Sequence, residues 1–307
     1  MILVFGNCGL KYLLNFLTLS KEFRDKYDMP LIPIKSNDKE KIADYIKIKG
    51  SYIIIPNFMV IEKKENLDKY YNQEYDLVII QQTPDRHHVY SSKSVISRLK
   101  YKDIIILPWV RNDGFHAMPI WPHIGNLSRR IKRVQNKIID IQNTNEKTIS
   151  FQKIINLFYN HSLDEVFDML ENLKIDFNLL NRFNNSIEIL KEKEEFCNIT
   201  VSDIILNNKG HLFHGPPHPS GYLYQLIANK IFTLLGITEV ISIYDNVTSE
   251  EMEVLDRKYN LIPDYDQFPL SPYEINTFNL NCKPSKKWLE YYKNKISEIY
   301  KRFQELK

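Results

Sequence analysis

The sequence has few cysteines and few glycines. Only three of its 307 residues are cysteine, namely Cys8, Cys197 and Cys282, and they lie far apart along the chain. An odd number of widely separated cysteines does not indicate a disulfide framework, and it fits a reducing compartment. Only 9 glycines accompany 19 tyrosines and 16 phenylalanines, which argues against disorder and against glycine-rich repeats.

Strong net charge and long apolar runs are also missing. The formal net charge is +3, so the composition gives no electrostatic argument for binding nucleic acid or a membrane surface. No apolar run approaches the length needed to span a bilayer. The first apolar run is soon interrupted by Lys11 and lacks the basic region that opens a signal peptide. We therefore expect a cytoplasmic protein that binds neither nucleic acid nor membrane.

The first 125 residues alternate short apolar runs with amphipathic segments. Strands are expected over residues 2–6, 31–35, 51–56, 76–82 and 103–110. Helices are expected over residues 10–19, 38–48 and 92–100. The runs DLVIIQQ and DIIILPWV are apolar on both faces, as central strands of a parallel sheet are. The alternation predicts an α/β fold with an open, flavodoxin-like parallel sheet flanked by helices.

The pattern changes after residue 125. Residues 126–200 contain only amphipathic helical segments, such as SLDEVFDMLENL. The rest of the chain, 201–307, again shows α/β character, with a helix over 219–235, a strand-like run at 239–244 and a final helix over 285–306. We expect one α/β core formed by 1–125 and 201–307, with a helical insertion at 126–200.

The stretch FGNCGLKYLL places Cys8 between a buried strand and a helix. Open α/β sheets bind ligands at the carboxyl ends of their strands. The amino end of a helix favours a thiolate, and its free N–H groups can hold an oxyanion. Cys8 is therefore a candidate nucleophile, with Asn7 as a candidate oxyanion ligand. The alternative is a small buried thiol that fills the junction.

Two histidines are further candidates. Pro219 suits the first turn of a helix, which places His218 at or near the helix cap, where a neutral imidazole is favoured as a base. His116 follows a buried strand and the polar loop RNDGF. The alternative for His218 is that it only caps the helix. The alternative for the loop before His116 is a turn that packs over the sheet edge.

Other polar residues follow a central strand in QQTPDRHH. Gln81 and Gln82 are suited to orient a substrate or an intermediate, and Arg86 is suited to meet a phosphate. The spacing of His211, His214 and His218 also suits a zinc site, with His116 or Cys8 as the fourth ligand. Two prolines in HGPPH fix an extended geometry and no second ligand pair is recognisable, so we expect no metal.

The order of these motifs resembles the WcbI-type polysaccharide biosynthesis acetyltransferase family. GNC after the first strand, QQ followed by SSKSVISRL, a strand leading to GFH, and HPSGYLYQLIANKIF carry the resemblance, over roughly residues 2–122 and 210–236. The family usually has Gln after GNC, where this chain has Gly9. It usually has Pro-Asp after the middle histidine, where this chain has Ala117 and Met118.

The resemblance implies a fold related to SGNH hydrolases, binding of acetyl-coenzyme A, and acetyl transfer to a sugar hydroxyl in capsule or surface-glycan synthesis. It places Cys8 at the nucleophile-like position and His116 and His218 at the two family histidines. Asn7, Gly9 and Gln82 would then surround the reacting groups. Arginines are the expected partners of the coenzyme A phosphates. The candidates are Arg86, Arg111, Arg129 and Arg130.

Two other functions fit the same residues. An SGNH-like esterase or thioesterase would use water in place of the sugar. A non-catalytic glycan- or nucleotide-binding protein would show no turnover, and its ligand affinity would survive the loss of Cys8 and His218.

Overall fold

The structure is a computed structural model, which describes residues 1–7, 9–32, 47–49, 51–56, 67–112, 114–117, 124–135, 147–215, 218–245, 247, 249–258 and 269–306. The chain forms two compact units. The sheet unit comprises residues 1–110, 188–208 and 219–261, and the helical unit comprises residues 111–187, 209–218 and 262–307. The expected division into 1–125, 126–200 and 201–307 stays a prediction.

A sheet forms the centre of the sheet unit. β1 (Ile2–Gly6), β3 (Tyr52–Pro56), β4 (Glu74–Gln81) and β5 (Lys100–Leu107) are parallel, in the order β3-β1-β4-β5. β2 (Lys47–Lys49) adds an antiparallel edge beside β3. The predicted α/β fold with a parallel sheet flanked by helices is thus confirmed, apart from this one antiparallel strand.

The strand order contains a reversal next to β1. From β1 the chain adds β3 on one side, and it then crosses to the other side of β1 to add β4 and β5. Such a reversal separates the loops that leave two neighbouring strands, and it creates a crevice at their carboxyl ends where doubly wound proteins bind ligands. In this sheet the reversal lies between β1 and β4.

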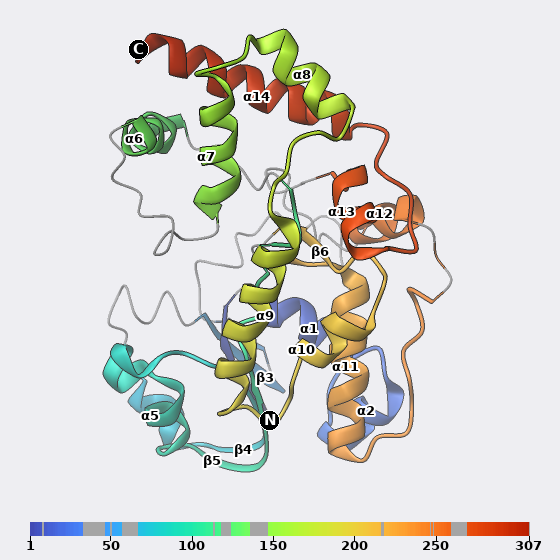
Figure 1. The fold of residues 1–307 in the computed structure, drawn as a ribbon. Helices are drawn as coiled ribbons and strands as arrows, with labels where there is room; N and C mark the ends of the chain where they lie inside the picture. The colour runs from blue at the N-terminus through green and yellow to red at the C-terminus, as the bar shows by residue number, and fades with distance from the viewer. Residues whose placement is uncertain are drawn as a thin grey trace. The chain divides into compact units, whose positions relative to one another are not determined.

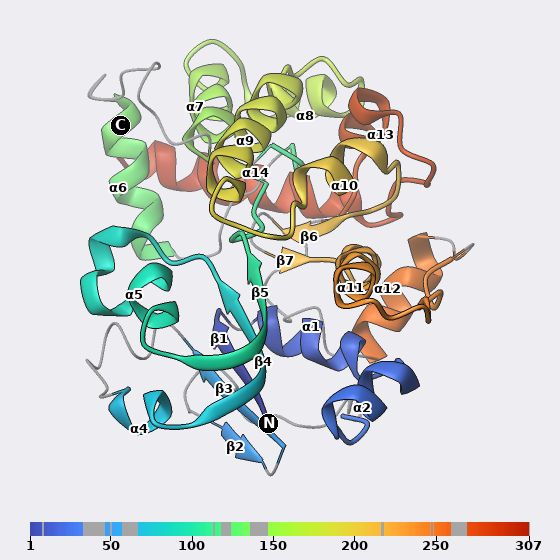
Figure 2. The same ribbon diagram turned by 90° about the horizontal axis from the view of Figure 1, so that it is seen from below.

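Helices cover both faces of the sheet (Figure 2). α1 (Gly9–Leu17), α2 (Lys21–Tyr27) and α11 (Gly221–Leu235) lie on one side, and α4 (Asp68–Tyr71) and α5 (Ser92–Ile96) lie on the other. Alternate residues of each strand face opposite sides, so one set packs under α4 and α5. This buried cluster contains Leu3, Phe5, Ile53, Ile55, Tyr70, Val78, Ile80 and Val95.

The outer edge of β5 is covered by a segment from much later in the chain. The side chain of Asn198 accepts a hydrogen bond from Ile106 N at 2.6 Å and donates one to Ile104 O at 2.7 Å. The backbone N–H groups of Asn198 and Ile199 donate to Ile106 O. These bonds satisfy an exposed strand edge. They also hold the end of α9 (Leu179–Glu194) and the residues after it beside the sheet.

Several sequence predictions in this unit differ from the structure. The helix expected over 92–100 is shorter, since α5 ends at Ile96 and β5 begins at Lys100. The run 239–244 contains no strand. Its backbone is bound by side chains of α11 instead, because Asn229 bonds both N and O of Ile241, and Gln225 accepts from Tyr244 N. Residues 47–48 form a strand rather than the end of a helix, and residues 31–32 are irregular. The remainder of the predicted segments 31–35 and 38–48 lies outside the described residues.

The helical unit has its own apolar core, formed between the helices that Figure 1 shows. α6 (Ile124–Gln135), α7 (Lys147–Leu157) and α8 (Leu163–Glu171) contact α14 (Trp288–Glu305), and α13 (Pro272–Phe278) lies in the same unit. The core includes Ile131, Phe151, Ile154, Val166, Leu170, Ile296 and Phe303. The predicted helical segments are confirmed within the described part of the chain.

Short elements complete the two units. α10 (Ser202–Asn207) and α12 (Ser249–Lys258) belong to the sheet unit, and η2 (Asp85–Tyr90) follows β4. β6 (Phe213–Gly215) pairs with β7 (His218–Pro219) in a small second sheet. In the part of the chain that the structure describes, none of the helices has the length and apolar character needed to cross a membrane.

Candidate functional site

Two polar side chains meet where β1 and β4 end, at the reversal of strand order. Asn7 follows β1 directly, and its backbone N–H donates a hydrogen bond to the side-chain oxygen of Gln81, the last residue of β4, at 2.9 Å. The side-chain oxygen of Asn7 accepts from Gly9 N, also at 2.9 Å. Asn7 therefore joins the end of β1 to both β4 and the first turn of α1.

The glycines on either side of this turn are required by close contacts. A Cβ at Gly6 would overlap the side chain of Leu10 and lie 2.7 Å from Gln81 Cβ. A Cβ at Gly9 would lie 2.6 Å from the hydroxyl oxygen of Tyr224, which projects from α11. Any side chain at position 9, including the glutamine that the family resemblance expects there, would require the Tyr224 side chain to shift, and Gly9 allows α1 and α11 to approach closely.

Cys8 lies outside the described residues, between Asn7 and Gly9 in sequence. Cys197 is a less suitable nucleophile. Burial, with a contribution from the nearby Glu194 carboxylate, raises the pKa of the Cys197 thiol to about 12. A thiol with this pKa carries almost no thiolate at neutral pH, so Cys197 does not compete with Cys8 as a candidate.

Gln82 and Arg86 lie just beyond β4. The backbone N–H of Gln82 donates to Leu107 O at 2.7 Å, which extends the pairing of β4 with β5 by one residue, and its side chain is half-buried. Arg86 is exposed in η2. The buried partner of Asn7 is Gln81, and Gln82 stays a candidate ligand of the substrate or intermediate.

His116 is fully buried in the helical unit. Its Nε2 lies 3.0 Å from Phe213 O. A carbonyl only accepts hydrogen bonds, so the proton is on Nε2. Burial, reinforced by the nearby His211 ring, lowers the pKa of His116 well below its usual value. His116 is therefore a neutral imidazole that donates from Nε2.

Two buried side chains, those of Arg182 and Glu274, hold the backbone of His116 and Ala117. Arg182 of α9 donates to His116 O at 3.1 Å and to Ala117 O at 3.3 Å. Glu274 of α13 accepts a hydrogen bond from Ala117 N at 2.5 Å, and it also accepts from Tyr292 Oη at 3.0 Å. Both side chains are fully buried, and burial raises the pKa of the Glu274 carboxyl. The backbone at the middle histidine is thus fixed by α9 and α13 rather than by the aspartate that the family pattern has there.

Three other histidines of the helical unit, His211, His214 and His218, lie near His116 or before α11. The rings of His211 and His214 are 5.1 Å apart, and those of His116 and His211 are 6.5 Å apart, measured between centroids. His218 is half-buried in β7. Among the described residues, no group of three His, Cys, Asp or Glu side chains is arranged to hold a metal ion.

The cap of α11 differs from the prediction. Ser220 is the N-cap, and its hydroxyl accepts from Leu223 N at 3.3 Å. Pro219 therefore precedes the helix instead of opening its first turn, and His218 lies two residues before the cap.

The candidate arginines are in different parts of the chain. Arg111 is half-buried at the start of the helical unit, and Arg129 is exposed in α6. Arg130 is also in α6, and its side chain lies outside the described part of the structure. Arg86 belongs to the sheet unit.

Comparisons with known proteins gave one structural likeness. No protein-family model matches the sequence, and no curated protein matches it. A solved structure of WcbI, described as a novel polysaccharide biosynthesis enzyme, covers 98% of this chain and 98% of its own, with 13% sequence identity and a TM-score of 0.45. That structure is described as the native protein without a disulfide bond between coenzyme A and one of its cysteines.

Proposed function

We propose that the protein is a cytoplasmic acetyl-coenzyme A-dependent O-acetyltransferase. It acts on a sugar or polysaccharide precursor in capsule or surface-glycan synthesis. Its fold is related to that of the SGNH hydrolases. The hydrogen bond between Asn7 N and Gln81 across the reversal of strand order carries this proposal. It fixes the residue before Cys8 at the edge where doubly wound sheets bind ligands. Acetyl transfer is chosen as the reaction because of the order of the sequence motifs around Cys8, His116 and His218.

In the proposed reaction the Cys8 thiolate attacks the carbonyl carbon of the acetyl thioester. A bond forms between the Cys8 sulfur and the acetyl carbon, the bond from that carbon to the coenzyme A sulfur breaks, and coenzyme A leaves as a thiolate that takes up a proton. One thioester replaces another, so the exchange is nearly balanced in free energy. Gly9 N and Leu10 N donate to Asn7 in this structure, so other N–H groups behind Cys8, with Asn7 or Gln82, would hold the tetrahedral oxyanion.

His218 completes the transfer in this scheme. Its imidazole takes the proton of the sugar hydroxyl, the sugar oxygen bonds to the acetyl carbon, and the Cys8 sulfur leaves as a thiolate. In a second route the sugar oxygen attacks the thioester directly, and Cys8 only lines the site.

The proposed partners of the coenzyme A phosphates are arginines, namely Arg86, Arg111, Arg129 and Arg130. Arg182 and Glu274 act as positioning residues, through the backbone of His116 and Ala117.

Release of free coenzyme A from acetyl-coenzyme A tests the reaction class. We expect release to rise at least about tenfold when a suitable sugar or glycan acceptor is added, because transfer requires the acceptor hydroxyl. Mass spectrometry of the acceptor should show one added acetyl group. Release that is the same with every acceptor would indicate a thioesterase. Absence of release under all conditions would indicate a binding protein and would contradict the proposal.

A further inference from the structure

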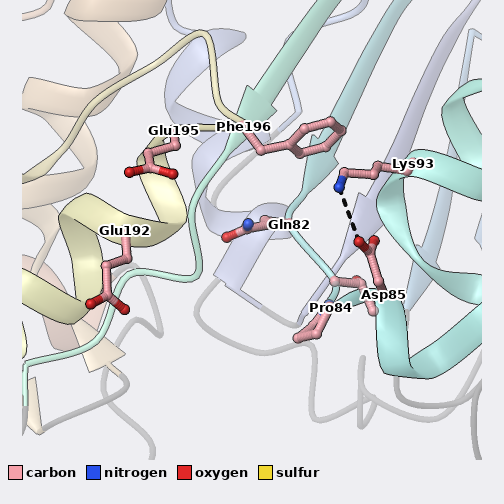
Figure 3. A pocket seen from close by; sticks show the side chains of 8 residues that line it. Gln82, Pro84, Asp85, Lys93, Glu192, Glu195 and Phe196 are labelled. Carbon is pink, nitrogen blue, oxygen red and sulfur yellow. Dashed lines mark hydrogen bonds and ion pairs between the residues drawn. The ribbon is translucent and has the colours of Figure 1, made fainter.

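A pocket of about 360 Å³ opens beyond the carboxyl end of β4, within the sheet unit. Figure 3 shows it lined by Gln82 and Asp85 after β4, by Lys93 of α5, and by Glu192, Glu195 and Phe196 at the end of α9. A volume of this size suits a ligand of one or two sugar rings. Gln82 directly follows Gln81, which binds the residue before Cys8.

The α9 side of the pocket is held firmly in place. Glu194, which lies between the two lining glutamates, is buried, and its carboxylate accepts hydrogen bonds from Val201 N at 2.5 Å and from Ser202 N at 2.8 Å. Asn198 binds the edge of β5 through both its side chain and its backbone. These contacts fix the segment that carries Glu195 and Phe196, so this wall of the pocket is formed before any ligand binds.

The charge of the pocket is negative. Its lining contains three carboxylates and one ammonium group. Lys93 forms an ion pair with Asp85 at 3.0 Å, and its ammonium lies 5.5 Å from the centre of the Phe196 ring. The single cation is therefore already engaged, while the exposed carboxylates of Glu192 and Glu195 remain to face a ligand. An anionic ligand, including the phosphates of coenzyme A, would be repelled here.

We propose that this pocket binds the acceptor sugar, and that it selects an uncharged or amino-bearing sugar ring against anionic sugars. Glu192 and Glu195 accept hydrogen bonds from vicinal hydroxyls or an ammonium group of the ring, since ionised carboxylates are strong acceptors. The Gln82 amide offers a donor and an acceptor for one further hydroxyl. The ring of Phe196 covers the apolar C–H face of the sugar. This assignment rests on the proposed function, and it names the acceptor class for that function.

Direct binding of monosaccharides tests the assignment without any turnover. Glucosamine, glucose and glucuronate are titrated by NMR into the full chain without acetyl-coenzyme A, at a pH where the amine of glucosamine is protonated. We expect glucosamine to bind best, glucose next, and glucuronate least. In the double variant Glu192→Gln, Glu195→Gln the affinity for glucosamine should fall about three- to tenfold, as expected for two exposed charges, and the discrimination against glucuronate should shrink.

A matched control is available on the same helix. Glu188→Gln removes an exposed charge that pairs with Lys191 at 2.9 Å outside the pocket, and it should leave all three affinities unchanged. Equal binding of glucuronate and glucosamine, no binding of any of the three sugars, or a double variant that behaves like Glu188→Gln would overturn the assignment.

The two proposals can fail separately. If the acceptor pocket is wrong but the acetyltransferase reaction is right, acceptor-dependent release of coenzyme A persists with the same acceptor preference in the double variant. If the pocket is right but the reaction is wrong, the sugars bind in the expected order and no acceptor stimulates release of coenzyme A.

Discussion

Replacing Cys8 by alanine is expected to lower kcat/KM for acceptor-dependent acetyl transfer by at least about a thousandfold, because the proposed covalent route loses its nucleophile. His218→Asn should cause a loss of similar size, since the acceptor hydroxyl then keeps its proton. If the two groups act as a unit, the double variant should be no slower than either single variant. The measurement is steady-state release of coenzyme A with and without the acceptor.

Cys282→Ala is the matched control for this experiment, because it removes another thiol, half-buried in the helical unit, and it should keep full activity. Mass spectrometry after mixing with acetyl-coenzyme A adds a direct readout, in which only the covalent route leaves an acetyl group on Cys8. A Cys8→Ala enzyme that stays within about tenfold of the wild type, beside an inactive His218→Asn enzyme, would contradict a nucleophilic Cys8 and favour direct attack by the sugar.

Replacing Arg182 by methionine is expected to lower the free energy of unfolding by about 3–5 kcal/mol. The guanidinium of Arg182 is fully buried and donates to the carbonyl oxygens of His116, Ala117 and Phe177. Methionine fills a similar volume but leaves these three buried acceptors without their charged donor. Urea unfolding, followed by circular dichroism, gives the change in stability.

The control for Arg182 is Lys132→Met, which removes an exposed positive charge from α6 in the same unit and should change stability by less than about 0.5 kcal/mol. Arg182→Lys should be intermediate, since it keeps the charge but lacks the fork geometry that bridges several carbonyls. If Arg182→Met proved as stable as the wild type, the cost of burying the guanidinium would equal the gain from its hydrogen bonds, and the described role in fixing His116 would be wrong.

The sheet could be predicted from the sequence because its strands contain apolar runs. The runs within 76–82 and 103–110 correspond to β4 and β5 within a few residues. The prediction that 103–110 is a central strand buried on both faces is wrong, because β5 is an edge strand and several of its residues are exposed or half-buried. Local signals also located α11, which starts just after Ser220 and ends before Gly236. These signals act within a few residues, so a single sequence records them.

Partners that are distant in sequence account for the errors. The apolar alternation of 239–244 is typical of a strand, yet two side chains of α11, Gln225 and Asn229, bind its backbone in place of a neighbouring strand. Nothing within 239–244 indicates this competition. The edge of β5 is covered in a similar way by Asn198, about ninety residues later.

The candidate site was accessible from the sequence only in part. Asn7 and Gly9 stand out because they flank a cysteine at a strand end. The series Ser271-Pro272-Tyr273-Glu274 is a capping box with proline at the first helical position, so the start of α13 was readable. The hydrogen bond that Glu274 accepts from Ala117 N could not be predicted, because it joins residues 157 positions apart. The pocket lining of Glu192, Glu195 and Phe196 depends on similar long-range contacts.

A crystal structure of the full chain with bound coenzyme A tests the central claim most directly. The account predicts that the coenzyme A sulfur lies within about 4 Å of the Cys8 sulfur, with the His218 imidazole facing the same point, as reacting groups require. It also predicts that the phosphates lie away from the acidic pocket of Glu192 and Glu195. Coenzyme A bound far from Cys8, or a His218 ring more than about 10 Å from the thiol, would contradict it.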